Sequence, residues 1–309
     1  MIPGGNAQAL LIGQKAAQRL SLPGYRGRVL AVVSSAIYLS GHDGEILWLG
    51  RPGLPAHRRC ILAPFRAENV EAGMDFVATG RCLTVGDAMT VDLAHADSWV
   101  PHTITRTLPQ GVVKAHVREV LEVTQSLPVS GLGHTLALIT QPVEHTDYST
   151  VSTTESILLN RAEPVIQELI VACRRRDLER IVQAGLNLVG LGPGLTPSGD
   201  DYLGGLLFSV YYLKAAYPSE FTKEDDPLDD FLSKARLSTN HISYTILSDL
   251  AYGHGPAPLH DLIRFLLQGS EEQPWQDSAK QLIRIGHTSG WDMLAGALTG
   301  MLLCDPIDG

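Results

Sequence analysis

The same short frame, Ser-Gly-x-Asp-x-Leu-x-Gly, occurs twice in the sequence, from Ser198 to Gly205 and again from Ser289 to Gly296. Each copy follows a short apolar stretch that ends in glycine. A glycine-rich entry to a helix exposes unpaired backbone N–H groups at the positive end of the helix dipole. The aspartate at the same place supplies a hydrogen-bond acceptor or a metal ligand. The repeat therefore predicts two related helix starts that face one ligand site.

The aspartates of the two frames limit what such a site can bind. Asp200 and Asp201 in the first copy, with Asp292 in the second, would repel a phosphate or a carboxylate unless their charge is offset. One solution is a hard cation such as Mg²⁺, held by Asp200 and Asp201 or by Asp292 and bridging to ligand oxygens. The other is a ligand that carries an anionic group together with an amide or ammonium N–H. We expect the three aspartates to be catalytic, and Mg²⁺ is the one cofactor that the pattern indicates.

The run from Gly190 to Asp201 is rich in glycine and proline, so it has little conformational freedom and lets a ligand approach the backbone closely. It lacks the lysine of a Walker A loop. A purely structural alternative is that Ser198 caps a helix and Asp201 is the acidic half of a capping box. That alternative leaves the adjacent Asp200 and the second frame unexplained. The expected ligand-binding residues are Gly192, Gly194, Thr196, Ser198, Gly199, Thr239, Ser243, Ser289 and Gly290.

Two histidines and one pair of hydroxyls are further candidates. His287 lies two residues before Ser289 and is a candidate acid, base or cationic clamp. His134 stands in a second glycine-rich turn and is the other candidate. Thr239 and Ser243 lie four residues apart, on one face of a predicted helix, although hydroxyls within helices commonly bond back to the backbone.

Small residues at four-residue spacing follow each frame, and they indicate how the two helices meet. Gly204 and Gly205 lie in the first helix, and Gly296 and Gly300 lie in the second. Glycines at these positions let two helices pack closely, which would bring the carboxylates of the two frames together. A separation above about 15 Å would exclude a shared site, because no single metal or small ligand bridges that distance.

The elements that must position these residues fall into two groups, which predicts an α+β protein with two domains. The first domain, residues 1–150, is expected to be β-rich and to begin with one helix, over 6–20. Its strands are expected at 29–39, 45–49, 59–63, 76–85, 89–93 and 136–140. The second domain, residues 151–309, is expected to be mostly helical and to carry both frames. Its helices are expected at 153–175, 177–189, 198–215, 228–252, 258–268, 275–285 and 289–303.

Composition narrows the class of function. The 309 residues carry 33 acidic and 24 basic side chains, a formal net charge of −9, without the basic stripe that a nucleic-acid face needs. The four cysteines are scattered and form no C-x-x-C pair of the kind that zinc and redox sites use. No apolar stretch is long enough to cross a bilayer. We therefore expect a cytoplasmic protein that binds neither nucleic acid nor membrane.

The run Gly190–Asp201, with Val189 before it, resembles the signature of the AllH-like family. The segments Gly286–Asp292 and Thr239–Ser243 are similar to the pattern of the same family. The resemblance covers the C-terminal half of the chain well and the β-rich half only loosely.

The resemblance implies that the chain is one subunit of oxamate carbamoyltransferase, acting with an FdrA-like subunit and a third protein in anaerobic allantoin degradation. That enzyme moves a carbamoyl group between phosphate and oxamate and links oxalurate breakdown to carbamoyl phosphate. Both molecules pair an anionic group with an amide, which is the combination that the aspartates require. The implied partners are therefore a small anionic amide or phosphate ligand and two other protein subunits.

Two other classes of function use the same residues. In the first, the chain is a metal-assisted hydrolase or ligase of a small carboxylated amide. In the second, it is a non-catalytic scaffold or metabolite-binding subunit that reports the ligand to its partners.

Overall fold

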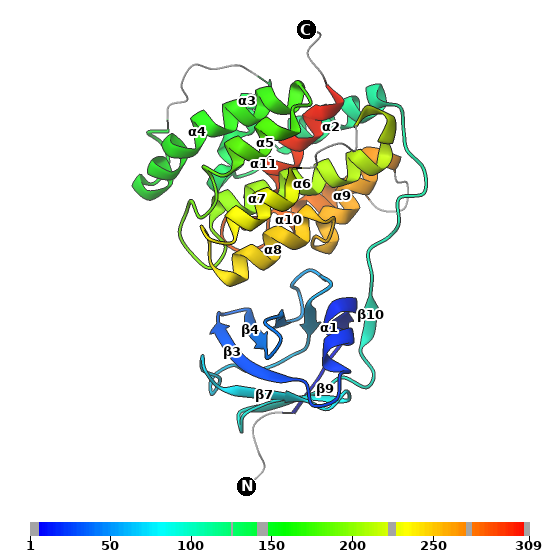
Figure 1. The fold of residues 1–309 in the computed structure, drawn as a ribbon, viewed down its shortest axis with the longest axis vertical. Coiled ribbons are helices and arrows are strands. Elements are labelled where there is room, and N and C mark those ends of the chain that lie inside the picture. The colour runs from blue at the N-terminus through cyan, green and yellow to red at the C-terminus, as the bar shows by residue number, and fades with distance from the viewer. Residues whose placement is uncertain (1–5, 125, 141–147, 222–226, 270–273, 306–309) are drawn as a thin grey trace. The chain divides into compact units, whose positions relative to one another are not determined.

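The computed structural model describes residues 6–124, 126–140, 148–221, 227–269 and 274–305. The chain forms two compact units, Met1–His102 and Thr103–Gly309 (Figure 1). The compact units divide the chain after His102, so the described residues between 103 and 150 belong to the helical unit, and the expected domain boundary at residue 150 stays a prediction. The α+β class is confirmed, with strands in the first unit and helices in the second. None of the helices in the described ranges combines the length and the apolar character that crossing a bilayer requires.

The first unit is built on one sheet of ten strands, in the order β1-β9-β8-β7-β3-β4-β5-β6-β2-β10. Most neighbours are antiparallel, and the parallel pairs are β1 with β9, β5 with β6, and β2 with β10. The strands are β1 (Asn6–Gln8), β2 (Leu11–Gly13), β3 (Arg26–Val32), β4 (Ala36–Gly41), β5 (Ile46–Gly50), β6 (Cys60–Leu62), β7 (Asp75–Ala78), β8 (Cys82–Val85), β9 (Met89–Asp92) and β10 (Asp97–Trp99). One helix, α1 (Gln14–Leu20), follows β2.

The helix expected over residues 6–20 is wrong in its first half. Residues 6–8 pair with 90–92, and Leu11 and Ile12 pair with β6, so only Gln14–Leu20 is helical. The change from strand to helix comes at Gly13, the N-cap of α1. Glycine is needed there, because a Cβ would lie 2.1 Å from the carbonyl oxygen of His57. Pairing with distant strands has overridden the local amphipathic period.

Three basic side chains of the first unit surround the carboxylate of Glu45. Its carboxylate accepts from Lys15 Nζ at 2.7 Å, Arg19 Nη2 at 3.0 Å and Arg59 Nη1 at 2.6 Å. Partial burial opposes ionisation of Glu45, but the three cations outweigh it and lower its pKa to about 2. The network ties α1 to β5 and to the residue before β6.

The elements of the second unit that the structure describes are all helices. Its elements are α2 (Gln110–Thr124), η1 (Gly131–Leu136), α3 (Ala137–Thr140), α4 (Thr153–Arg174), α5 (Leu178–Gly185), α6 (Ser198–Ala216), η2 (Pro218–Glu220), α7 (Leu228–Ala235), α8 (His241–Ala251), α9 (Ala257–Gln268), α10 (Trp275–Leu282), α11 (Ser289–Gly300) and η3 (Met301–Cys304). The strand expected at 136–140 is wrong, because this apolar segment packs as a short helix with Leu138 and Ile139 buried. The single helix expected over 228–252 is broken into α7 and α8, with Asn240 as the N-cap of the second.

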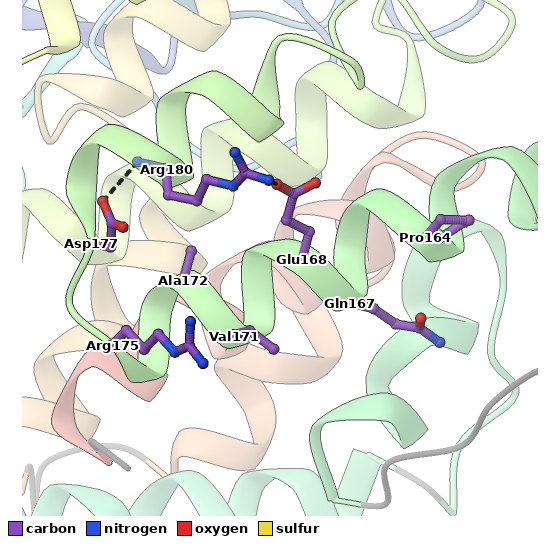
Figure 2. A pocket seen from close by; sticks show the side chains of 8 residues that line it. All are labelled: Pro164, Gln167, Glu168, Val171, Ala172, Arg175, Asp177 and Arg180. Atoms are coloured by element: carbon purple, nitrogen blue, oxygen red, sulfur yellow. Dashed lines mark hydrogen bonds and ion pairs between the residues drawn. The ribbon is translucent and has the colours of Figure 1, made fainter. Parts of the chain in front are cut away.

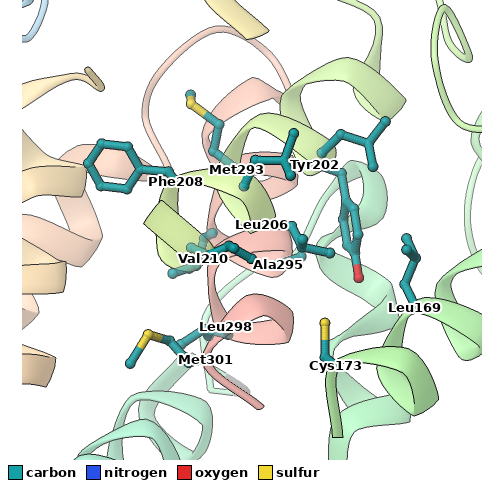
Figure 3. Close-up of a cluster of buried hydrophobic side chains, with 14 of the residues drawn as sticks. Leu169, Cys173, Tyr202, Leu206, Phe208, Val210, Met293, Ala295, Leu298 and Met301 are labelled. Atoms are coloured by element: carbon teal, nitrogen blue, oxygen red, sulfur yellow. The ribbon is translucent and has the colours of Figure 1, made fainter. Parts of the chain in front are cut away.

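Helices α6 and α11 form the centre of this unit and are buried along most of their length. Figure 3 shows their apolar side chains, among them Tyr202, Leu206 and Leu298, packed together with Leu169 and Cys173 of α4. The two backbones touch. A Cβ on Gly205 would lie 2.0 Å from the carbonyl oxygen of Met293, and one on Gly296 would lie 1.8 Å from that of Tyr202. The predicted close packing of the two frame helices is thereby confirmed.

Candidate functional site

The first turns of α6 and α11 meet through their hydroxyl groups. Thr196 Oγ1 lies 3.1 Å from Ser289 Oγ, and Ser198 Oγ lies 3.4 Å from Thr288 Oγ1. Each serine of the repeated frame therefore pairs with a threonine of the other copy. The two helix starts therefore lie together, and a ligand site shared between them stays a prediction.

The segments that lead into the two helices are arranged in the same way. The N–H of Gly199 donates to the carbonyl of Leu191 at 2.8 Å, and the N–H of Gly290 donates to that of Ile285 at 3.0 Å. A Cβ on Gly199 would lie 2.0 Å from the carbonyl oxygen of Leu188, and one on Gly290 would lie 1.9 Å from that of Leu282. These contacts explain the glycine of each Ser-Gly pair. Between the copies, Gly205 meets Met293 and Gly296 meets Tyr202, and this reciprocity relates the copies by an approximate two-fold.

The two copies differ in the loop that joins each apolar stretch to its helix. Residues 193–197 separate Gly192 from Ser198, whereas residues 287–288 separate Gly286 from Ser289. The longer loop has three glycines with positive φ: Gly190 at 76°, Gly192 at 120° and Gly194 at 97°. Residues 193–195 are exposed, and a Cβ on Gly194 would meet nothing within 4 Å. This loop therefore offers open backbone at the rim of the site.

Asp201 and Asp292 lie beneath the four hydroxyl groups. Their side chains are almost fully buried, at 4% and 0% exposure. The Oδ2 atom of each carboxyl group is buried without a hydrogen-bond partner. Because a buried polar atom without a partner is costly, one such oxygen in each of these two carboxyl groups marks the pair as a candidate ligand site.

Burial raises the pKa of the Asp201 carboxyl well above its ordinary value of 3.8, and the nearby Asp292 carboxyl raises it further. Hydrogen bonds from the Ser289 and Thr196 hydroxyls act in the opposite direction. Burial also raises the pKa of Asp292, to about 7, against hydrogen bonds from the Leu132 N–H and from the Thr288 and Ser198 hydroxyls. Each aspartate thus bonds to the serine of the other copy, and neither ionises as readily as an exposed carboxyl group.

Asp200 has a different environment, although it too is buried. Its Oδ1 accepts from the N–H of Gly190 at 2.7 Å, and its Oδ2 accepts from the hydroxyls of Ser243, at 2.6 Å, and Thr239. Three protein donors therefore engage the carboxylate that we expected to be catalytic or to bind Mg²⁺. In this arrangement Asp200 anchors the glycine-rich loop to the start of α8. Thr239 and Ser243, expected at the ligand, serve that anchor.

The backbone at the two helix starts is also engaged. The N–H groups of Asp200 and Asp201 donate to the carbonyl of Pro197 at 2.9 and 3.1 Å, and that of Asp292 donates to the carbonyl of Thr288 at 2.9 Å. The expectation that the first helical N–H groups hold an anion is therefore not met for these three. The capping alternative is also wrong, because Pro197 is the N-cap of α6 and no side chain caps the helix.

A third element completes the site from the η1 turn. The N–H of Leu132 donates to Asp292 Oδ1 at 2.6 Å, and the N–H of Gly131 donates to Glu155 Oε1 at 2.6 Å. Gly131 has a φ of 57°, and a Cβ there would lie 2.4 Å from Asp292 Oδ1. His134 Nε2 lies 3.7 Å from Glu155 Oε1. The site thus has the glycine-rich turn of His134 as one wall.

Sequence reasoning missed Glu155. Its one local signal is that it follows Ser152 by three residues, at the start of α4, where the Ser152 hydroxyl accepts from its N–H at 3.3 Å. That spacing reads as an ordinary helix cap. The hydrogen bond from Gly131 to Glu155, and the effect by which the charge of Glu155 raises the pKa of Asp292, both depend on tertiary structure.

His287 lies at the rim. The residue is exposed, and its carbonyl oxygen accepts from Ser130 Oγ at 3.4 Å. The predicted ring chemistry of His287 remains a prediction. Among the described residues, no group of three or more His, Cys, Asp or Glu side chains is placed to hold a metal ion.

A separate pocket of about 400 Å³ lies on the surface of α4 and α5 (Figure 2). Arg180 pairs there with Glu168, and its backbone N–H donates to Asp177 at 2.9 Å. The lining residues are Pro164, Gln167, Glu168, Val171, Ala172, Arg175, Asp177 and Arg180. None of them belongs to the paired helix starts.

Comparison with known proteins finds a family model that matches the segment with both frames. Residues 188–301 match the family model described as oxamate carbamoyltransferase subunit AllH. The match spans a little over a third of the chain, confirms the resemblance over that segment, and contains both frames. The η1 turn and Glu155 lie outside it. No solved structure matches the chain.

Proposed function

We propose that this chain, through the segment that matches the AllH model, is a subunit of an oxamate carbamoyltransferase and that the paired helix starts bind the carbamoyl-bearing ligand. The observation that supports the proposal is the pair of buried, partnerless carboxyl oxygens of Asp201 and Asp292 inside the matched segment. A ligand site explains why a protein would retain two such atoms, since removing either would relieve a desolvation cost.

The ligand chemistry fits the groups around the pair. Oxamate and carbamoyl phosphate each carry an anionic end and a carbamoyl end. The exposed backbone of residues 193–195 suits the anionic end, because the N–H groups of a glycine-rich loop can turn toward it. The hydroxyls of Thr196 and Ser289 at the rim can orient the carbamoyl end. Transfer would then depend on positioning and on stabilising the negative charge that develops on oxygen.

The reaction that we assign is the exchange of the carbamoyl group between oxamate and phosphate. In the degradative direction, a phosphate oxygen attacks the carbamoyl carbon of oxalurate, the bond from that carbon to the oxamate nitrogen breaks, and the nitrogen takes up a proton. The products are oxamate and carbamoyl phosphate. We propose that an FdrA-like subunit and a third subunit complete the enzyme, in line with the word subunit in the family's description.

The test is a reconstituted complex. The chain is co-expressed with the FdrA-like and third subunits, and carbamoyl phosphate is measured after adding oxalurate and phosphate. We expect Asp201→Asn and Asp292→Asn to lower turnover by about 100-fold or more, as loss of a preorganised polar group in an active site commonly does. The matched control is Asp277→Asn, which removes an exposed carboxylate from α10 of the same unit.

Turnover close to wild type in both site variants would refute the assignment of the site. If calorimetry shows that the complex binds oxamate, and turnover is unchanged when both aspartates are replaced by asparagine, the chain is instead an accessory binding subunit. Hydrolysis of oxalurate without phosphate would favour a hydrolase.

A further inference from the structure

We propose that Asp201 and Asp292 together hold one divalent cation of the Mg²⁺ or Mn²⁺ class, at the approximate two-fold between the starts of α6 and α11. The inference deepens the proposed function, because the cation would meet the ligand of the same site. It rests on that function only for the identity of the ligand.

The two partnerless oxygens carry the proposal. Asp201 Oδ2 and Asp292 Oδ2 are both buried and both lack a donor. The hydroxyl pairs Thr196–Ser289 and Ser198–Thr288 join the two helix starts, and the charge of Asp292 acts on Asp201, so the two carboxyl groups lie close together. A divalent ion between them would satisfy both oxygens and neutralise both charges at once. A single shared proton would neutralise only one.

The burial of the two carboxyl groups limits the size of a ligand that can reach them. With exposures of 4% and 0%, the carboxyl groups present almost no surface to a ligand of several heavy atoms. An amide-bearing molecule placed above the hydroxyls would contact Thr196 and Ser289 before it reached either carboxylate. An ion can occupy the deeper position and still reach ligand oxygens from there.

The surrounding atoms are those that a hard cation prefers. Four hydroxyls, those of Thr196, Ser198, Thr288 and Ser289, hydrogen-bond to the pair, and Asp292 also accepts from the N–H of Leu132. Oxygen ligands in octahedral geometry suit Mg²⁺, which is commonly held by one or two carboxylates with hydroxyl, water or substrate oxygens. Two carboxylates fall short of a site built from protein acids alone, which leaves positions for ligand oxygens.

The assignment differs from the one that the sequence suggests. Asp200 and Asp201 are adjacent, which suggests a pair of metal ligands. The oxygens of Asp200, however, accept hydrogen bonds from Gly190, Thr239 and Ser243. The second carboxylate therefore comes from the other copy of the frame. Asp200 fixes the loop above the ion.

The experiment measures metal binding by the full chain on its own, without an activity assay. Protein freed of metal with a chelator is titrated with Mn²⁺, and binding is followed by electron paramagnetic resonance and by the thermal midpoint. We expect one Mn²⁺ per chain, displaced by Mg²⁺, with a rise in midpoint that follows Mn²⁺ concentration. Asp201→Asn and Asp292→Asn should each weaken binding by about 100-fold, whereas Asp277→Asn should bind as wild type does.

Circular dichroism verifies that the variants fold, and asparagine keeps an oxygen that can accept from the Leu132 N–H. Should either asparagine variant fail to fold, Thr288→Val removes one hydroxyl and no charge, and we expect it to weaken Mn²⁺ binding by a smaller factor. Folded wild-type chain that binds no Mn²⁺ would overturn the inference. Equal binding in the aspartate variants, or in Thr288→Val where it replaces them, would do so too.

Failure of the cation and failure of the proposed function are distinguishable. If a chelator-treated complex transfers carbamoyl groups at the full rate while Asp201→Asn does not, the cation is excluded and the function stands. If the chain binds Mn²⁺ through the pair but the complex forms no carbamoyl phosphate, the function falls and the metal site stands.

Discussion

At the scale of single residues, the three aspartates of the two repeated frames have two different environments. Asp201 and Asp292 each keep a buried oxygen without a hydrogen-bond partner, whereas Asp200 is satisfied by three donors. The difference lies in what faces each carboxylate across the fold. Residue type and spacing predict that the aspartates matter, but they do not separate the two environments.

The raised pKa of Asp292 predicts how stability depends on pH in the metal-free chain. Because its pKa is about 7 when folded and 3.8 ordinarily, the folded chain binds the extra proton between these values, and the free energy of unfolding falls as pH rises through that window. Urea unfolding with chelator at several pH values measures this. Relative to Asp292→Asn, wild type should lose up to about 1.4 kcal/mol per pH unit. Parallel curves for the two proteins would contradict the prediction.

Asp200→Ala should destabilise the helical unit strongly, because it leaves the partly buried donors of Gly190 and Thr239 and the buried hydroxyl of Ser243 without their acceptor. We expect a loss of about 3 kcal/mol or more in the free energy of unfolding, measured by urea titration. Asp277→Ala on α10 is the control and should change stability little, since its carboxylate is exposed. A loss no greater than that of the control would refute the anchoring role.

At the scale of elements, the close contact of α6 and α11 depends on the absence of a side chain at two positions. A Cβ on Gly205 or Gly296 would overlap a carbonyl oxygen of the opposite helix, at 2.0 or 1.8 Å. We expect Gly205→Ala and Gly296→Ala each to destabilise the protein by about 3 kcal/mol, since the two buried backbones must separate. Chemical unfolding gives the value.

The control for these variants is Gly111 of α2, where an added Cβ meets nothing within 4 Å. Gly111→Ala should be neutral or stabilising by up to about 1 kcal/mol, because alanine favours helix. Similar effects at Gly111 and Gly205 would show that the helix contact is looser than described.

Much of the helical unit was predictable from sequence, and the reason is local. Helices α4, α6, α9 and α11 follow amphipathic or apolar periods whose bounds the sequence marks within a few residues. The strands at residues 6–8 and 11–13 could not be found in this way, because their partners lie about fifty to eighty residues away, at 61–62 and 90–92. Glu155 and the Leu132 N–H also enter the site through tertiary contacts, which span 24 and 160 residues.

At the scale of the whole molecule, the chain has two hydrophobic cores, one in each compact unit. We therefore expect variants to affect one core at a time. Glu45→Gln leaves the nearly buried Arg59 without its carboxylate, so it should lower the calorimetric transition of the sheet unit and spare that of the helical unit. Gly296→Ala should do the reverse. One transition that moves equally in both variants would contradict this independence.

Acid has a predictable effect on the same unit. The pKa of Glu45 is lowered to about 2 from an ordinary 4.5, so its contribution to stability is present above the ordinary value and is lost as pH falls toward 2. Calorimetry of wild type and Glu45→Gln should therefore converge in acid. Asp75→Asn is the control, because its pair with Arg28 is about three-quarters exposed on both sides and adds little.

The approximate two-fold between the frames is not carried through to their surroundings. Asp292 receives a main-chain N–H from Leu132, while Asp201 is held by hydroxyls, and only the first copy has the five-residue glycine loop above it. A duplicated scaffold has thus been given two unlike ends. A ligand whose two ends differ, one anionic and one carbamoyl, would therefore bind in one preferred orientation. Every bound molecule would then present the same bond to a subunit that covers the site.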